Sequence, residues 1–342
     1  MFGFAVAAFV VSSWLVWRLA SPTARFRIID EPNDRSLHTV AIPRTGGLGI
    51  LGGLVVGSVL STVFLPIDFP LSIAIGMVVV AIVSFRDDCG GVQVGVRFTV
   101  HVLASLVLLA GGLVPASLEL PGATWDWPTP VAAVITILFT VWMINLYNFM
   151  DGMDGFAGGM ALIGFTTFAV FGWFADKPSF ALASLLVASS SAGFLVFNFP
   201  PARIFMGDTG SSTLGFLAAG FTLWAARDGI FPLWLGLLIF SPFVVDATVT
   251  LLRRVIRRDK IWVAHKTHYY QRVVQLGWGH KKATLIEYLL MLGCVVSALY
   301  IWRRPAPVQL TVLFCWACSY FALMRLIDKW DQRASIGKIT RP

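Results

Sequence analysis

Charged side chains are scarce in this sequence. Only 13% of its 342 residues are Asp, Glu, Lys or Arg, whereas 57% are apolar, and the mean hydropathy is +0.78. Soluble domains carry about 25% charged residues, so this composition excludes a water-soluble globular protein. The 26 basic residues outnumber the 18 acidic ones, giving a net charge of +8. In so apolar a chain this excess indicates membrane topology and contact with membrane lipids, and no nucleic-acid partner is expected.

Cysteine is also scarce, and the four cysteines are too scattered for a disulfide framework. Cys315 and Cys318 form a C-x-x-C pair inside the apolar run LTVLFCWACSYFALM, which is typical of two small residues in a bilayer helix. Basic residues are missing before the first apolar stretch and appear only from Arg18 onward. A cleaved signal peptide has the opposite order, so we expect a first spanning helix with its N-terminus outside.

Long apolar runs occupy most of the chain. A spanning helix needs about 20 mostly apolar residues, and windows of that length predict ten or eleven spans. The predicted spans are 2–20, 46–65, 70–85, 98–115, 129–149, 158–175, 179–199, 212–226, 230–251, 284–302 and 306–325. We therefore predict an all-α integral membrane protein in which residues 1–342 form a single multi-pass domain.

The basic residues test this topology independently. With the N-terminus outside, 22 of the 26 Lys and Arg fall in the inner segments. The outer segments hold only Lys177, Arg227, Arg303 and Arg304. Because cytoplasmic loops of membrane proteins are enriched in Lys and Arg, this distribution supports the orientation. Any chemistry is then expected on cytoplasmic loops.

Five acidic residues gather in three of the inner segments. Asp87 and Asp88 lie in SFRDDCGG, Asp151 and Asp154 in NLYNFMDGMDGFAGG, and Asp208 in PPARIFMGDTGSS. Clustered carboxylates repel one another unless a cation neutralises them. Oxygen-rich clusters suit a hard cation, and Mg²⁺ takes one or two carboxylates together with substrate phosphates. Glycines around these acids allow close approach of a ligand, so we predict that a phosphate group binds here together with a metal ion.

Cationic, imidazole and amide side chains lie in the same inner segments. They are suited to phosphate oxygens. The candidates are Arg35, His38 and Arg44 in the first long inner segment, His265, Lys266, His268, Gln271 and Arg272 in the last, and Asn148 near the end of an apolar helix. Each signal also has a structural interpretation, because Asp, Ser and Gly favour caps and turns, and an Asn near a helix end often pairs helices. Because three loops with acidic residues lie on one membrane face, we favour a role in binding or catalysis for these residues together.

Asp246 stands apart because it lies inside the apolar segment FSPFVVDATVT. An unpaired charge at the bilayer centre costs about 2.5–3.5 kcal/mol on the insertion scale. We therefore expect Asp246 near the inner end of its helix, facing the protein interior. There it either takes part in function or pairs helices.

Taken together, these segments resemble the polyprenyl-phosphate N-acetylhexosamine-1-phosphate transferases. These bacterial enzymes start O-antigen, teichoic acid and peptidoglycan lipid intermediates. The resemblance runs from DEPNDRSLHTVAIPRTGG through FRDD, NLYNFMDGMDGFAGG and PARIFMGDTGSS to HKTHYYQR. It implies a glycosyltransferase family 4 enzyme of the bacterial inner membrane that moves sugar-1-phosphate from a UDP-N-acetylhexosamine to undecaprenyl phosphate. A homodimer is allowed.

The resemblance also implies roles for single residues. Asp208 would be the principal Mg²⁺ ligand, with Mn²⁺ as a substitute ion. Asp87 and Asp88 would bind or deprotonate the lipid phosphate or assist the metal, with Asp88 as second ligand. The nucleotide and diphosphate would be contacted by Asp151, Asp154, Asn148, Arg203, His265 and His268, with His38 and Arg44 as further contacts.

Departures from the family pattern narrow the substrate. The peptidoglycan branch carries adjacent histidines in its last inner loop, whereas this chain has HKTHYYQR followed by LGWGHKKAT. This form favours the enzymes that initiate O-antigen over a phospho-N-acetylmuramoyl-pentapeptide transferase. A secondary transporter is the alternative from another class, but transporters place their charges near the bilayer midplane. A CDP-alcohol phosphotransferase would need an Arg soon after the first DG, where this chain has FAGGMALIGF.

Overall fold

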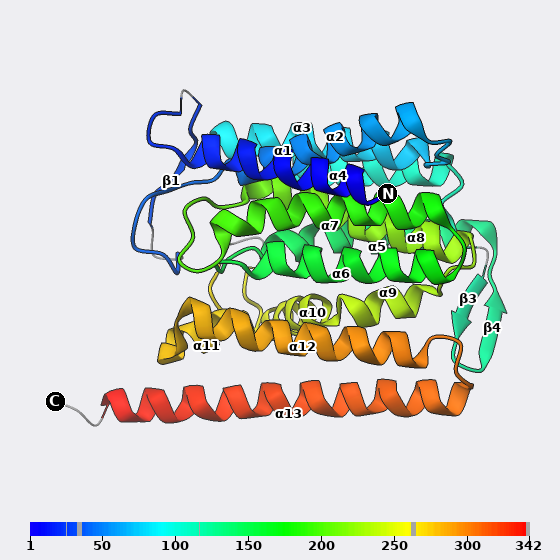
Figure 1. The fold of residues 1–342 in the computed structure, drawn as a ribbon. Coiled ribbons are helices and arrows are strands. Elements are labelled where there is room, and N and C mark those ends of the chain that lie inside the picture. The colour runs from blue at the N-terminus through cyan, green and yellow to red at the C-terminus, as the bar shows by residue number, and fades with distance from the viewer. Residues whose placement is uncertain (25, 33–35, 116, 261–264, 340–342) are drawn as a thin grey trace.

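The computed structural model describes residues 1–24, 26–32, 36–115, 117–260 and 265–339. Within these residues the regular secondary structure is helical apart from four short strands, and the helices lie side by side in one bundle (Figure 1). The elements are α1 (Phe2–Ala20), β1 (Ile29–Asp30), β2 (Ile42–Pro43), α2 (Gly46–Phe64), α3 (Leu71–Gly90), α4 (Val94–Ala110), β3 (Ser117–Leu120), β4 (Ala123–Asp126), α5 (Thr129–Phe149), α6 (Phe156–Phe174), α7 (Pro178–Asn198), α8 (Gly207–Arg227), α9 (Leu233–Ile239), α10 (Ser241–Ile256), α11 (Tyr269–Val273), η1 (Val274–Trp278), α12 (Gly279–Ile301) and α13 (Ala306–Ile339). The predicted all-α membrane architecture is confirmed.

Seven helical segments of the described chain are long and apolar enough to cross a membrane. An eighth is the pair α9 and α10, which is bent by 86°. The sequence predicts one continuous span over 230–251, and this is wrong in shape because the helix breaks at Phe240, just before Pro242. A proline lacks the backbone N–H that a continuous helix needs. The predicted ten or eleven spans would require α3, α4 and α8 to cross as well, so that number stays a prediction.

Helix α8 lies inside the bundle, where it packs against α2, α3 and α5. Every residue from Thr209 to Ala225 is buried, and many of them are Gly, Ala, Ser or Thr. Such small side chains let helix backbones approach closely within a membrane. A Cβ atom on Gly215 would lie only 2.6 Å from the carbonyl oxygen of Met143 on α5. This close contact holds the polar end of α5 against the start of α8.

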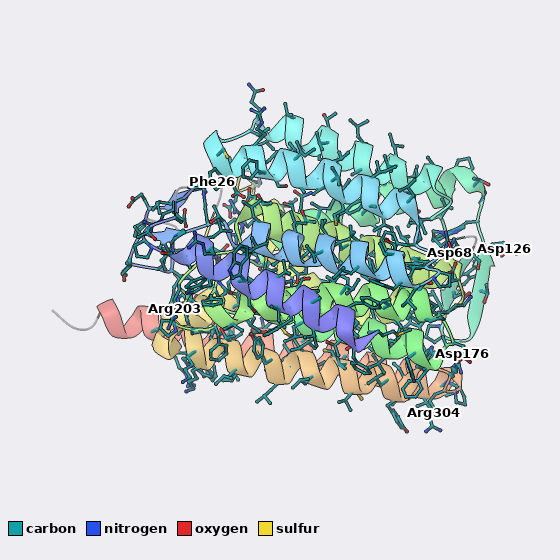
Figure 2. All side chains as sticks on the ribbon, turned by 45° about the horizontal axis from the view of Figure 1, so that its top comes forward. Phe26, Asp68, Asp126, Asp176, Arg203 and Arg304 are labelled. Atoms are coloured by element: carbon teal, nitrogen blue, oxygen red, sulfur yellow. The ribbon has the colours of Figure 1, made fainter. Side chains whose placement is uncertain are left out.

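The two ends of the bundle carry different loops. Phe26 and Arg203 lie at one end, whereas Asp68, Asp126, Asp176 and Arg304 lie at the other (Figure 2). These are the sides that the basic-residue distribution predicts for them. The chain starts toward the end that holds β3 and β4, and α13 runs to the opposite end (Figure 1). We refer to the end with Arg203 as the cytoplasmic end.

Candidate active site

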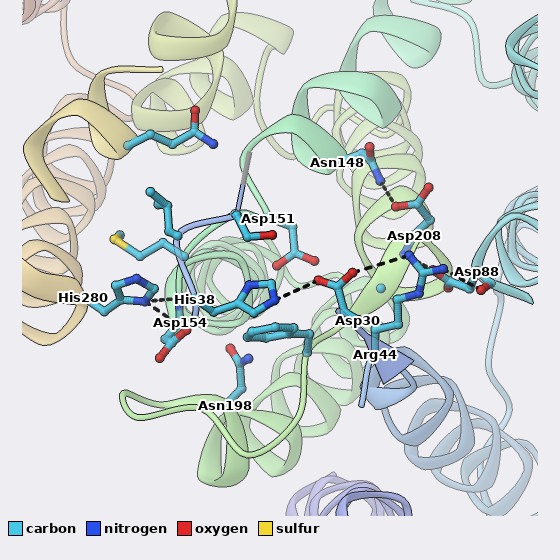
Figure 3. Close-up of a pocket in the computed structure, with 17 residues that line it drawn as sticks. Asp30, His38, Arg44, Asp88, Asn148, Asp151, Asp154, Asn198, Asp208 and His280 are labelled. Carbon is cyan, nitrogen blue, oxygen red and sulfur yellow. Dashed lines mark hydrogen bonds and ion pairs between the residues drawn. The ribbon is translucent and has the colours of Figure 1, made fainter. Parts of the chain in front are cut away.

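A polar cavity of about 200 Å³ lies where segments distant in sequence meet (Figure 3). Its walls come from the first long loop, the end of α3, the loop between α5 and α6, the start of α8 and the start of α12. Five carboxyl groups and three cationic or imidazole side chains line it. They are Asp30, Asp88, Asp151, Asp154 and Asp208, and His38, Arg44 and His280.

Asp208 occupies the first turn of α8, where the free N–H groups and the helix dipole favour negative charge. Its Oδ1 accepts a hydrogen bond from Asn148 Nδ2 at 2.8 Å, and the same amide donates to Ser211 Oγ at 3.0 Å. Arg97 Nη1 lies 3.2 Å from the other carboxylate oxygen. The structure therefore brings together Asp208 and Asn148, as the sequence predicts, and adds Arg97.

Asp88 is placed on the last turn of α3, rather than in a loop, and is 3% exposed. Its carboxyl oxygens accept hydrogen bonds from the backbone N–H of Asp208 at 3.0 Å and of Thr209 at 2.9 Å, and from the Thr209 hydroxyl at 2.6 Å. The first N–H groups of a helix have no partner within it, so this carboxyl satisfies the start of α8. Asp88 thus joins α3 to α8 and lines the cavity as well.

Asp87 is not among the residues that line the cavity. One of its oxygens accepts the backbone N–H of Val92 at 2.6 Å, and the other is ion-paired with Arg97. Because Arg97 also contacts Asp208, this arginine bridges the two carboxylates. Asp87 reaches the site through Arg97, which was not predicted as a site residue.

Asp151 lies in the loop between α5 and α6 and points into the cavity (Figure 3). Burial, followed by the nearby charges of Asp208, Asp88 and Asp30, raises the pKa of its carboxyl to about 8. Burial and like charges both disfavour an ionised carboxylate. The cavity holds five carboxyl groups against one arginine and two histidines, so a bound cation would lower the repulsion among the carboxylates.

Asp154 in the same loop pairs with His280 at the start of α12, with 3.0 Å between Oδ1 and Nδ1. Its second oxygen accepts the backbone N–H of Ala202 at 3.0 Å. His280 lines both the polar cavity and an adjoining hollow of about 570 Å³. This histidine lies in LGWGHKKAT and was not predicted as a site residue, because its partner Asp154 lies 126 residues away in the sequence.

The first long loop contributes a chain of polar contacts. His38 Nε2 lies 3.5 Å from Asp30 Oδ2, and Arg44 Nη1 lies 3.9 Å from Asp30 Oδ1. Arg44 also donates a hydrogen bond to the carbonyl oxygen of Asp88 at 2.8 Å. The His38 ring packs edge-on against Phe205, with 4.8 Å between centroids. His38 and Arg44 are thus at the cavity as predicted, Asp30 was missed, and Arg35 lies outside the described residues.

Three predicted contacts are not brought to the cavity. Arg203 is exposed outside it. His265 stacks on His268, with 4.8 Å between ring centroids, and neither ring lines the cavity. The helix α11 begins directly after His268, and it is Gln271, three residues later, that lines the cavity.

No group of three His, Cys, Asp or Glu side chains is arranged as a ready-made metal site in the part of the chain that the structure describes. Mg²⁺ does not require one, because it commonly binds through one or two carboxylates, waters and substrate phosphates. The carboxyl groups of Asp151 and Asp208 in one cavity fit an ion that binds together with a phosphate.

Comparison with known proteins agrees with this geometry. Residues 70–226 match the model of glycosyl transferase family 4. The chain is 32% identical over 298 residues to a decaprenyl-phosphate N-acetylglucosaminephosphotransferase of Mycolicibacterium smegmatis, an alignment covering 78% of this chain and 73% of that protein. The chain belongs to the polyprenyl-phosphate N-acetylhexosamine-1-phosphate transferase family. It is a multi-pass bacterial membrane protein.

Other members of this transferase family are similar over most of the chain. A probable undecaprenyl-phosphate N-acetylglucosaminyl 1-phosphate transferase of Bacillus subtilis is 29% identical, covering 90% of this chain and 88% of that protein. A phospho-N-acetylmuramoyl-pentapeptide-transferase of Staphylococcus epidermidis is 24% identical, covering 88% and 98%. The family match contains Asp88, Asp151, Asp154 and Asp208, whereas Asp30 lies before it.

Proposed function

We propose that this transferase moves N-acetylhexosamine-1-phosphate from a UDP-sugar to undecaprenyl phosphate and releases UMP. The observation that carries the proposal is the polar cavity, which sets five carboxyl groups beside arginine and histidine at the cytoplasmic end of a membrane bundle. The names of the relatives from B. subtilis and M. smegmatis support a polyprenyl phosphate acceptor and an N-acetylated sugar donor.

The chemistry needs positioning and charge neutralisation more than a protein nucleophile. An oxygen of the lipid phosphate attacks the phosphorus that carries the sugar, and the bond from this phosphorus to the bridging oxygen breaks. UMP leaves with that oxygen. Both reactants are anions, so Arg44 and Arg97 would lower their mutual repulsion.

We favour direct attack over a phosphoryl-aspartate intermediate. The acceptor phosphate is already anionic and nucleophilic. In addition, the carboxyl oxygens of Asp87 and Asp88 are engaged by Val92, Arg97 and the start of α8. A carboxylate held in this way is better suited to organising the site than to attacking phosphorus.

Mg²⁺ is the proposed cofactor, with Mn²⁺ as a substitute. Asp208 on the first turn of α8 would hold it, and Asp88 on the last turn of α3 would assist, since both line the cavity. A divalent ion bound there would stabilise the charge on phosphate oxygens. The carboxyl groups gathered around Asp151 support this assignment.

The pathway is proposed on the form of the last inner segment. The HKTHYYQR sequence favours initiation of O-antigen or a similar envelope polysaccharide. A phospho-N-acetylmuramoyl-pentapeptide transferase is the second candidate, favoured by the similarity to the S. epidermidis protein. A homodimer also stays a prediction.

A transfer assay tests the proposal. Membranes containing the protein would be incubated with Mg²⁺, undecaprenyl phosphate and a panel of labelled UDP-sugars that includes UDP-N-acetylmuramoyl-pentapeptide. We expect label in the lipid phase and release of UMP with one N-acetylhexosamine donor. Transfer of the pentapeptide donor would select the second candidate, and no transfer from any donor would overturn the enzyme assignment.

Asp208→Asn is expected to lower turnover at least about 100-fold, because it keeps the side-chain size and removes the charge that would hold the cation. Membrane insertion should be normal. Asp228→Asn is the matched control. Asp228 is the C-cap of α8, at the opposite end of the helix from Asp208, and it also accepts a side-chain hydrogen bond, from Trp224 Nε1 at 2.9 Å. High activity of the Asp208 variant would remove Asp208 as the metal ligand.

A further inference from the structure

Asp246 is an acidic residue buried at 7% exposure on α10, as the sequence predicts for a charge in an apolar helix. Its Oδ1 accepts the backbone N–H of Tyr269 at 2.9 Å and the hydroxyl of Thr250 at 3.0 Å. Its Oδ2 accepts the backbone N–H of Tyr270 at 3.0 Å. His268 Nδ1 lies 3.3 Å from Oδ1. These contacts offset the cost of burying the carboxyl group and attach it to the start of α11.

The short helix α11 connects Asp246 to the candidate active site. The Tyr270 hydroxyl donates a hydrogen bond to the carbonyl oxygen of Phe149 at 3.1 Å. Tyr270 also fills the space beside Gly152, where a Cβ atom would lie 2.2 Å from its hydroxyl oxygen. The next residue, Gln271, lines the polar cavity together with Asp151.

The start of α11 is held by a capping box between His268 and Gln271 and by the carboxylate of Asp246. A helix of five residues has few internal hydrogen bonds, and its first N–H groups need partners from outside. Asp246 accepts two of them, one on each carboxyl oxygen. An asparagine has an NH2 group in place of one of these oxygens, so one of the two backbone N–H groups would face a donor instead of an acceptor.

We propose that Asp246 is a positioning residue: it fixes α11 so that Gln271 faces the cavity and Tyr270 supports the loop carrying Asp151. The inference rests on the proposed function, because it assigns this wall of the cavity to the UDP-sugar. Asp246 does not itself line the cavity and acts through α11.

A double-mutant cycle with kinetics tests the coupling. Asp246→Asn is expected to raise the KM for the UDP-sugar about tenfold, as for loss of a hydrogen bond to a charged group, with an unchanged KM for undecaprenyl phosphate. Gln271→Ala should raise the same KM. In the double variant the increase should be smaller than the product of the two single increases. An increase equal to the product, or an equal rise in both KM values, would overturn the proposal.

Two further measurements keep the inference testable if Asp246→Asn inserts poorly or if transfer is absent. Thr250→Val removes one donor to Asp246 and should shift the same KM by a smaller factor. Hydrogen exchange at the amides of Tyr269 and Tyr270 should accelerate at least about tenfold in Asp246→Asn and not in the Asp228→Asn control. Unchanged exchange would overturn the positioning role, whereas absence of transfer by the unsubstituted protein would overturn only the proposed function.

Discussion

Asp151 shows how a carboxyl group that faces a cavity lowers folding stability as the pH rises. Its pKa is about 8 in the folded protein, against an ordinary value of 3.8. Between these pH values the folded protein holds a proton that the unfolded chain has released. Folding stability contributed by this group therefore falls as the pH rises through that window.

Asp151→Asn should stabilise the ligand-free protein because it removes a buried charge that faces Asp208 and Asp88. A gain of about 1 kcal/mol would raise the melting temperature by about 2–4 °C. The measurement is thermal unfolding in detergent without divalent ions, at pH 5 and pH 8. The gain should be larger at pH 8, and an equal gain at both pH values would contradict this account.

Some residues of the site can be predicted from a local sequence motif, whereas others reach the site only through the fold. Asp151, Asp154 and Asp208 could be predicted because Asp and Gly cluster locally in the sequence. Asp30 and His280 could not, since each acquires its role from a partner that only the fold brings near. A motif also does not fix direction, which is why His268 turns toward Asp246 while Gln271 faces the cavity.

Among the helices, apolar length predicted the middles better than the ends. The predicted span 129–149 agrees with α5. The prediction 70–85 ends before the last turn of α3, and 212–226 omits the first turn of α8. Those turns hold Asp88 and Asp208, and polar residues lower the mean hydropathy of a window. The first turn of α8 forms there because Asp88 accepts two of its free N–H groups.

The close approach of α5 and α8 requires a residue without a Cβ atom at Gly215, and this can be tested. Gly215→Ala would place a methyl group 2.6 Å from the Met143 carbonyl oxygen and 2.8 Å from Ile144 Cα, so the helices must separate. We expect destabilisation by about 1–3 kcal/mol, measured by thermal unfolding, and lower transfer activity because Asn148 moves from Asp208.

Gly220 on the same helix is the matched control for this substitution. A Cβ atom there would lie 3.5 Å from Ile73, which is an ordinary contact. Gly220→Ala should leave stability unchanged or raise it, since alanine is favoured over glycine in a helix by about 1 kcal/mol. Equal destabilisation by the two alanines would show that close packing against α5 is not the cause.

For the whole molecule, the fold accounts for why acids and bases share one end. A lipid-embedded bundle leaves only its two ends for charged chemistry. The cytoplasmic end gathers the basic residues that determine orientation, and the same end holds the carboxylates of the cavity. The proposed binding of an anionic lipid head group and a nucleotide at that end would use both sets of charges.

The orientation itself can be measured by cysteine labelling in intact cells. In a chain whose four native cysteines are replaced by serine, Asp126→Cys should react with a membrane-impermeant maleimide, because β4 lies at the end assigned outside (Figure 2). Arg203→Cys, exposed at the cytoplasmic end, should react only after the cells are permeabilised. The reverse pattern would place the cavity outside the cell, where UDP-sugars made in the cytoplasm could not reach it, and would contradict both the topology and the proposed reaction.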